Sequence, residues 1–331
     1  MANITVQDIN NLRKRTGVGI MDCKKALIEA EGNVDKAIEI LREKGQKLAV
    51  KRADRAANEG VVLAKTTDDK TFGAVVMINC ETDFVANNKD FIAFVQSVLD
   101  AAVKAKAKTI ADVNQLDVNG TKVETLLVDQ LAKIGEKITF SNYKVVEAPI
   151  VYSYIHPGNR TASIVGLNRT GFDEAGKNLN FQVVSMRPQA LKKEDIPQSV
   201  IDEELRVNIE KSKQEQVHKA VEAALKKAGI NPAHVDSEDH MESNMAKGWI
   251  TAEDVAKAKD IIAKTSEEKL AKLNEPMIQN IAKGRLEKFF KENTLLSQDY
   301  FADSKINVQA YLESVDKDLT VIAFARLELG A

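Results

Sequence analysis

The apolar positions of residues 5–45 repeat at helical spacing in three successive stretches. The first stretch follows Thr5, which begins a capping-box-like motif, and the second stops at Gly32. The third runs from an Asn33 cap to Gly45, where we expect the helix to end. Residues 47–58 are rich in Lys, Arg and Ala. The pattern therefore predicts a small three-helix module followed by an exposed helical linker.

After residue 58 the apolar positions change to the shorter period and β-branched composition that are typical of strands. An acidic turn at Asp68-Asp69-Lys70 separates two such runs and predicts a hairpin. Helical spacing and a further strand follow the hairpin. The expected order is strand 60–65, strand 72–80, helix 91–103, helix 123–133 and strand 137–146.

A similar order then recurs in the second half of the chain. Two strand-like runs flank Pro157-Gly158-Asn159, a helix follows, and a final apolar run lies near the end of the chain. These elements are expected at 150–156, 161–167, 174–185 and 319–329. The last run is expected to complete the second sheet. The fold class predicted from this pattern is α+β, with two related α+β subdomains packed together.

Residues 198–273 are helical in pattern and highly charged, with thin apolar stripes that are interrupted between Gly229 and Gly248. Two helices that bury mainly against each other have this pattern. We therefore expect an antiparallel helical hairpin inserted in the second subdomain. Another helix is expected to start at Pro276 and to run through Lys291.

Composition and charge narrow the range of functions. Hydrophobic residues make up 44% of the 331 residues, and 47 Lys and Arg against 49 Asp and Glu give a net charge of −2. A chain this balanced has no global basic field for nucleic acid or anionic lipid. Residues 1–57 differ, because 12 Lys and Arg against 8 Asp and Glu give them +4. This difference favours a separate N-terminal module.

Targeting and redox signals are those of a cytoplasmic protein. No stretch approaches the roughly 18 unbroken apolar residues of a membrane helix, and the polar N-terminus lacks a signal-peptide core. Cys23 and Cys80 lie far apart, without the spacing of a zinc site or of a disulfide framework. We therefore expect a reducing cytoplasm and no membrane association.

No motif predicts an enzyme. Gly17-Val18-Gly19 lacks the third glycine and the preceding strand of a dinucleotide site, and no phosphate-binding P-loop motif occurs. The histidines lack metalloprotease spacing, and no serine lies in a nucleophile-elbow motif. His240 follows three carboxylates in a faintly metal-like cluster, for which a solvated loop is the favoured interpretation. We expect no catalytic residues, no cofactor, no metal site and no direct nucleotide binding.

Two segments allow a functional and a structural interpretation. A basic stretch could contact phosphates, but acidic residues dilute it and aromatics are absent, so a solvated face is favoured. It comprises Arg42, Lys44, Lys47, Lys51, Arg52 and Arg55. Residues 79–88 fall between a strand and a helix. They form either an ordinary loop with Phe84 in the core, or an exposed tip that presents Asp83 and Phe84 side by side.

Two long motifs carry a resemblance to a known family. Residues 12–27, LRKRTGVGIMDCKKAL, resemble the N-terminal signature of the bacterial elongation factor Ts family, and residues 79–86, NCETDFVA, resemble its second signature. Residues 284–290 and 324–328 are also similar to that family. The resemblance covers residues 1–210 and 276–331.

The resemblance implies a domain organisation and an activity. The domains would be a UBA-like three-helix domain (1–55), a core N-subdomain (56–140), a core C-subdomain (141–210 and 276–331) and a coiled-coil hairpin (211–275). The activity would be guanine nucleotide exchange on elongation factor Tu, by binding its GDP complex, dislocating Mg²⁺ and promoting GDP release so that GTP rebinds. The alternative is a non-catalytic module that holds a helical partner or RNA through the N-terminal helices and the basic linker.

The resemblance also implies roles for particular residues. Mg²⁺ dislocation from elongation factor Tu would fall to Thr82, Asp83, Phe84 and Val85. Partner contacts would come from Leu12, Ile20, Met21 and Gln182, although many relatives carry a histidine where this chain has Gln182. Further departures are Met77 in place of an acidic residue, the long insertion, and an end directly after the last strand, without the extra C-terminal helix of some relatives. A homodimer through the insertion stays open.

Overall fold

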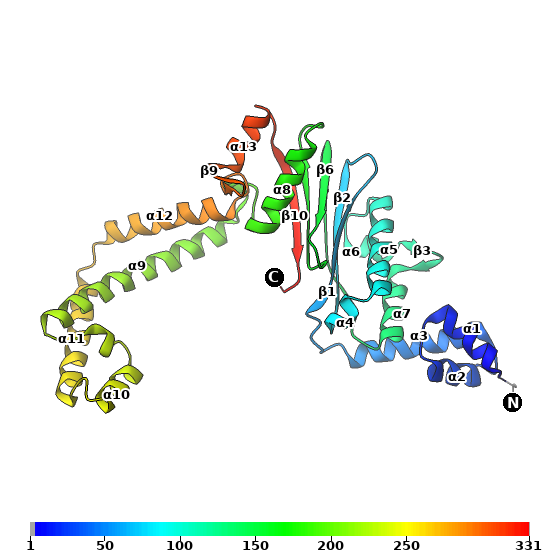
Figure 1. Cartoon of the computed structure of the whole chain (residues 1–331), viewed down its shortest axis with the longest axis horizontal. Helices are drawn as coiled ribbons and strands as arrows, with labels where there is room; N and C mark the ends of the chain where they lie inside the picture. Colours follow the sequence, from blue (N-terminus) through cyan, green and yellow to red (C-terminus); the bar gives the residue numbers. More distant parts are fainter. Residues whose placement is uncertain (1–3, 331) are drawn as a thin grey trace. The chain divides into compact units, whose positions relative to one another are not determined.

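The computed structural model describes residues 4–330 and divides the chain into two compact units. The first unit runs to Leu191 and resumes at Gln298, and the second comprises Lys192–Ser297. Helices and small antiparallel sheets together make up the described residues, which confirms the α+β class (Figure 1). None of the helices in residues 4–330 is long and apolar enough to cross a membrane.

The first unit begins with three helices, α1 (Val6–Thr16), α2 (Ile20–Glu29) and α3 (Val34–Lys51). The capping box of Thr5 and Asp8 starts α1, and the side chain of Asn33 caps α3, as the sequence predicts. The helices enclose a small core of their own, which comprises Ile9, Leu12, Val18, Cys23, Ala26, Leu27, Ala30, Ala37 and Leu41.

Helix α3 does not end at Gly45, and this expectation is wrong. Gly45 lies where α3 crosses α7 (Val123–Ile134), and a Cβ atom there would come within 3.1 Å of Ala132 and 3.2 Å of Val128. The glycine therefore permits close helix packing instead of stopping the helix. Leu48 and Ala49 pack against the core of the first sheet. The expected linker is helical up to Lys51 and most of its residues are exposed, as predicted, apart from this packed pair.

The first sheet has the antiparallel order β1-β2-β5 and confirms the expected hairpin. Its strands are β1 (Glu59–Thr66), β2 (Phe72–Cys80) and β5 (Thr139–Glu147). Helix α5 (Lys89–Ala105) packs on the face away from the second sheet. The shorter elements α4 (Asp83–Ala86), α6 (Ile110–Asn114), β3 (Asp117–Val118) and β4 (Thr121–Lys122) were not predicted from the sequence.

The second sheet has the antiparallel order β10-β7-β6. Its strands are β6 (Ile150–Ile155), β7 (Thr161–Leu167) and β10 (Val321–Glu328), and α8 (Asp173–Met186) packs on it. Strand β10 pairs with β7, so the final apolar run does complete this sheet, as expected. Three elements without a sequence prediction precede it: β8 (Asp299–Tyr300), β9 (Asp303–Asn307) and α13 (Val308–Val315).

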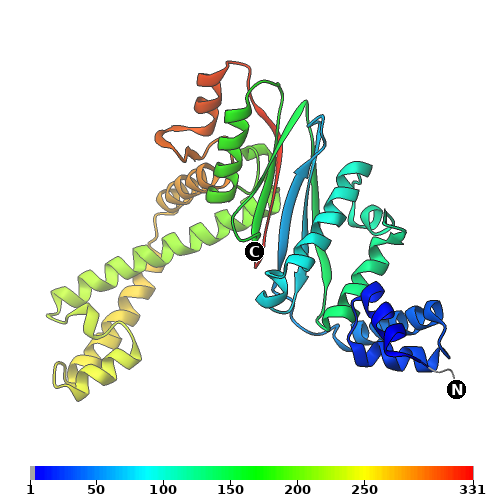
Figure 2. The same cartoon turned by 45° about the vertical axis from the view of Figure 1, so that its right-hand side comes forward.

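The two sheets pack face to face through small apolar residues. Figure 2 shows the strands between the cyan helix α5 on one side and the green helix α8 on the other. Gly73 allows the close approach, because a Cβ atom there would lie 2.7 Å from Val151 of the facing sheet. The shared core comprises Val62, Ala64, Val75, Val146, Val151, Ala162, Ile164, Ala325, Leu327 and Leu329.

The second unit is helical. Its long helix α9 (Gln198–Lys227) packs with α11 (Ala252–Ala271) and with α12 (Glu275–Asn293). Helix α10 (Glu238–Ala246) and the 3₁₀ turns η1 (Lys193–Asp195) and η2 (Pro232–His234) complete it. This compact unit extends beyond the 211–275 range expected for the insertion, because α9 contacts α12 as well as α11.

Candidate functional site

An exposed tip forms where strand β2 passes into helix α5. Cys80 ends β2 in the core, Thr82 precedes the four-residue helix α4, and Asn88 caps α5 through hydrogen bonds from the amides of Asp90 and Phe91. Backbone hydrogen bonds from Ala86 to Thr82 and from Asn87 to Asp83 close the turn. The segment is therefore a locally ordered turn between two regular elements.

The turn separates its side chains into an inner and an outer set. Ala86 is buried, and Val85 packs against the core of the first sheet. Asp83 is exposed, and Phe84 is 85% exposed, the largest value among the exposed large hydrophobic residues of the described chain. This excludes the interpretation in which Phe84 fills the core. An aromatic side chain that an ordered turn holds out in water is available for a partner contact.

Two carboxylates hold the tip from behind. Glu136 follows the end of α7, and its two oxygens accept hydrogen bonds from the backbone amide (3.0 Å) and the hydroxyl (2.8 Å) of Thr82. Glu81 accepts a 2.7 Å hydrogen bond from the amide of Lys137 and lies 2.6 Å from Nη1 of Arg52, the residue after α3. Three segments distant in sequence thus meet directly behind the tip.

The electrostatics of these groups follow from their contacts. The hydrogen bond from the Lys137 amide, followed by the Arg52 guanidinium, holds the pKa of Glu81 below its usual value. Burial raises the pKa of the Cys80 thiol to about 12, so Cys80 is not a reactive nucleophile at neutral pH. Both effects fit a supporting role for residues 80 and 81.

The turn between α1 and α2 lies near the tip. Gly17 ends α1 in the left-handed region with φ 69°, and its amide donates to the carbonyl of Arg13. Val18 turns into the small core, whereas Ile20 and Met21 are 45% and 61% exposed. The turn therefore presents two apolar side chains at the start of α2.

This turn and the tip both line a hollow of about 370 Å³. Lys133 of α7 lies between them, and its side chain passes within 2.9 Å of where a Cβ atom on Gly17 would be. The two signature motifs, which are far apart in sequence, thus border one surface. The hollow is lined by Gly17, Phe84, Val85, Asn88, Asp90, Phe91, Gln130, Lys133 and Ile134.

Two of the expected partner-binding residues offer no surface in this conformation. Leu12 is fully buried in the three-helix core. Gln182 is fully buried on α8, where its amide nitrogen donates to Gln298 and to the carbonyl of Asp299, and its oxygen accepts from the amide of Phe301. Leu12 therefore supports the three-helix core, and Gln182 supports the segment at Phe301.

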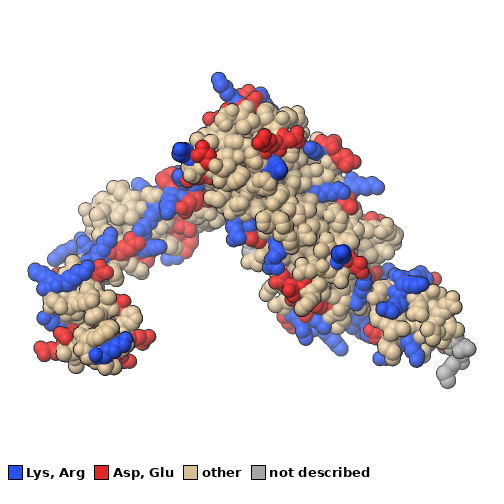
Figure 3. Space-filling model, viewed as in Figure 1, with Lys and Arg blue, Asp and Glu red and all other residues tan. Residues whose placement is uncertain are grey.

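Four of the six residues of the basic stretch form ion pairs. Arg42 binds Asp129, Lys44 binds Asp22, and both Arg52 and Arg55 face Glu81. Figure 3 shows basic and acidic side chains interspersed over the visible face. The described residues contain no group of three or more His, Cys, Asp or Glu that could hold a metal, and His240 pairs with Asp236.

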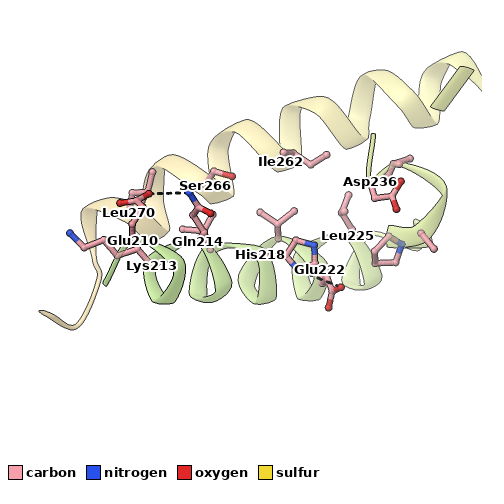
Figure 4. A pocket seen from close by; sticks show the side chains of 15 residues that line it. Glu210, Lys213, Gln214, His218, Glu222, Leu225, Asp236, Ile262, Ser266 and Leu270 are labelled. Carbon is pink, nitrogen blue, oxygen red and sulfur yellow. Dashed lines mark hydrogen bonds and ion pairs between the residues drawn. The ribbon is translucent and has the colours of Figure 1, made fainter. Parts of the chain in front are cut away.

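The second unit has a hollow of its own, of about 550 Å³, between α9 and α11 (Figure 4). Its apolar lining comes from Val217, Val221 and Leu225 of α9 and from Ile262 and Leu270 of α11. Glu210, Lys213, His218 and Glu222 border it. Among these polar groups, His218 lies 3.6 Å from Glu222.

Sequence reasoning missed the carboxylates that hold the tip. Glu81 lies inside the second signature motif, so its position beside the tip was a usable signal. Glu136 has no such signal, because it contacts Thr82 across 54 positions of the chain. The helix stop at Gly135 indicates a turn there but not what the turn contacts.

Comparison with known proteins gives a consistent result. A family model described as elongation factor TS matches residues 81–331. Elongation factor Ts of Bacteroides thetaiotaomicron is 51% identical over 329 residues and that of Parabacteroides distasonis 50%, each with 99% of both chains covered. Elongation factor Ts of Christiangramia forsetii is 38% identical over 332 residues, with 100% of both chains covered. The chain therefore belongs to the elongation factor Ts family.

Proposed function

We propose that this protein is the guanine nucleotide exchange factor for elongation factor Tu in cytoplasmic translation. One observation carries the proposal: in a member of this family, Phe84 is 85% exposed on a turn that its surroundings hold in place. An ordered turn that holds a bulky aromatic side chain out in water presents that side chain to a partner surface. The protein binds the GDP complex, promotes GDP release and leaves when GTP rebinds, without making or breaking a covalent bond.

The exchange step follows from the chemistry of the bound metal. Mg²⁺ demands near-ideal octahedral oxygen geometry, so a small displacement of its ligands weakens the site. Phe84 acts as a wedge between elements of the partner, and Asp83 competes for hydrogen-bond donors there. Val85 and Thr82 anchor the wedge in this chain. The metal and the nucleotide both belong to elongation factor Tu.

The α1–α2 turn provides the docking contact. Ile20 and Met21 are the exposed apolar residues at the end of this turn, and Gly17 of the same turn lines the hollow that Phe84 also lines. Leu12 supports this contact from inside the three-helix core. Gln182 plays the same part for the segment at Phe301, which is itself 43% exposed. Together these surfaces bind the partner at more than one point.

Exchange requires a thermodynamic coupling. If this protein weakens GDP binding to elongation factor Tu, then GDP weakens the binding of this protein by the same factor. Differential contacts in the two states are needed, and an ordered tip supplies them because it does not adapt to both states equally.

The proposal includes the division into domains that the family resemblance implies. It assigns α1–α3 to a UBA-like domain (1–55), the two sheets to two core subdomains, and residues 211–275 to a coiled-coil hairpin. We place exchange in the first unit. A homodimer through the insertion is a further proposal, and the apolar hollow between α9 and α11 is the surface that it would cover. Sedimentation velocity measures this association.

The alternative is a binding module without exchange activity, which holds a helical partner or RNA through the N-terminal helices and the basic linker. The ion pairs of Arg42, Lys44, Arg52 and Arg55 argue against an RNA contact, because those charges already have partners. The exposed Phe84 has no role in such a module.

Release of a fluorescent GDP analogue from elongation factor Tu separates the two functions. The proposal expects substoichiometric amounts of this protein to accelerate release many-fold in the presence of excess unlabelled nucleotide. A module that only binds would leave the release rate unchanged. That result would refute exchange even if a complex formed.

The docking role is tested at single positions, because a truncation at residue 56 would also remove Arg52 from Glu81. Ile20→Ser and Met21→Ser should each weaken binding about tenfold in calorimetry. Ile28→Ser is the matched control, since Ile28 lies on the same helix and is 56% exposed. Equal effects at positions 20, 21 and 28 would contradict a specific docking turn.

A further inference from the structure

Three separate segments meet behind the tip and contact its first residues. The end of α3 contributes Arg52, the loop before α4 contributes Glu81 and Thr82, and the loop after α7 contributes Glu136 and Lys137. The Lys137 side chain also donates to the carbonyls of Ala53 (2.5 Å) and Arg55 (3.0 Å). The 136–137 loop therefore joins the residues after α3 to the base of the tip.

The two carboxylates make contacts of different kinds. Glu136 accepts two hydrogen bonds from Thr82. These hydrogen bonds fix both the backbone and the side chain of Thr82. Glu81 is 13% exposed at its side chain and bridges two segments through the backbone amide of Lys137 and the guanidinium groups of Arg52 and Arg55. Hydrogen bonds to a charged acceptor in a partly dry site are stronger than those between neutral groups.

Helix α4 needs such support. It has four residues, and no side chain caps it at Thr82. A helix this short is unstable by itself, because nucleation fixes several backbone angles for very few hydrogen bonds. The Thr82 amide would face water as a free helix-terminal donor if Glu136 did not accept from it.

We propose that Glu136 and Glu81 are positioning residues for exchange, which hold the Thr82–Val85 tip in one orientation relative to α3 and the docking turn. This inference rests on the proposed function and deepens it. A wedge that is already ordered loses less conformational freedom when it inserts. The carboxylates touch neither nucleotide nor metal and act only through the tip.

The effect should fall on the release step and not on the encounter. Release of the GDP analogue is measured over a range of exchange-factor concentrations, which yields a maximal rate and a half-saturating concentration. Glu136→Gln keeps the volume and one acceptor oxygen, and it should lower the maximal rate about fivefold. Glu136→Ala should lower it more than tenfold, or about 1.4 kcal/mol of barrier. The half-saturating concentration should stay within about twofold for both.

Asp129→Asn is the matched control. Asp129 lies on α7, is half-buried like Glu136, and pairs with Arg42 of α3 and not with Thr82. It should leave the maximal rate within about twofold of the parent. A loss equal to that of Glu136→Gln would show that general loosening of α3 and α7 is responsible, and would overturn the inference.

A double-mutant cycle tests the contact itself. Thr82→Val removes the hydroxyl that donates to Glu136, so its effect and that of Glu136→Gln on the maximal rate should be less than additive. Amide hydrogen exchange provides a readout independent of activity. Protection at residues 82–86 should fall in Glu136→Gln, whereas protection in β7 should not change.

The outcomes are distinguishable from failure of the proposed function. A parent protein that does not accelerate GDP release would refute exchange and, with it, the positioning role. If the parent accelerates GDP release, and the folded Glu136→Gln and Glu81→Gln variants reach the same maximal rate as the parent, only the positioning role is refuted. If Glu136→Ala does not fold, the maximal rate of Glu136→Gln alone tests the positioning role.

Discussion

Arg52, the residue that follows α3, binds Glu81 at 2.6 Å directly before the exposed tip. The contact joins the N-terminal helices to the loop that carries Phe84, although the two residues are 29 positions apart. Arg52 therefore has a structural role inside the protein.

The exchange tip is the first target for mutation. Phe84→Ala should slow GDP release by about tenfold or more, because it removes the wedge. Asp83→Ala should slow release less. Both side chains are exposed, so neither change removes a core contact, and the thermal midpoint should stay within about 2 °C. A Phe84→Ala protein that unfolds, or that exchanges GDP at the parent rate, would contradict the assignment.

The distal part of the second unit should be dispensable for exchange. Replacing residues 217–271 by a short Gly/Ser link removes the hollow between α9 and α11 but keeps the Arg285–Glu215 ion pair. Most of the GDP release rate should remain, because the tip and the docking turn are untouched. A loss beyond about a hundredfold, roughly 2.7 kcal/mol of barrier, would show that this part takes direct part in exchange.

Gly176 is a packing position. A Cβ atom there would lie 2.1 Å from the ring of Tyr152, so Gly176→Ala must displace that buried ring. We expect a loss of about 1–3 kcal/mol in the free energy of unfolding. Gly284→Ala is the control, because that helical position is open and alanine favours helix. Calorimetry should show a lower transition for position 176 only, and equal transitions would contradict the contact.

The two cysteines should resist modification in the folded protein. Cys23 and Cys80 are both fully buried, and burial raises the pKa of Cys80 to about 12. At pH 8 a thiol reagent such as DTNB should react only after denaturant is added. The raised pKa also implies that stability falls as pH rises above about 8.5, the ordinary thiol value, where the unfolded thiol ionises first. Rapid reaction of either thiol in native buffer would contradict the burial.

The contacts of Glu81 with the Lys137 amide and with Arg52 predict that the stability of the protein depends on pH. The folded pKa of Glu81 is lowered, so its contribution is present above the ordinary value of about 4.3 and is lost as pH falls through the lower folded value. Glu81→Gln should therefore be less stable than the parent at pH 7, and the difference should shrink toward pH 3. Thermal unfolding at several pH values measures it. A constant difference would show that the charge of Glu81 is not involved.

Local patterns in the sequence determined most of the regular structure. The β-rich apolar run over 72–80 and the helical spacing over 91–103 predict β2 and α5, and β2 is buried along nearly its whole length. The cap at Asn33 and the pairing of the final run with the second sheet were also predictable. The same motifs that carry the family resemblance located the tip and the α1–α2 turn.

Only the tertiary structure decided which of these residues face outward. Leu12 and Phe84 are both large and apolar, yet Leu12 fills the three-helix core while Phe84 lies in water, because exposure depends on what packs above a position. The sequence around Gly45 predicts a helix stop, but in the structure α3 continues through Gly45, which packs against α7. Glu136 reaches Thr82 only because the chain folds back over 54 positions, and no local pattern encodes a contact between segments that far apart.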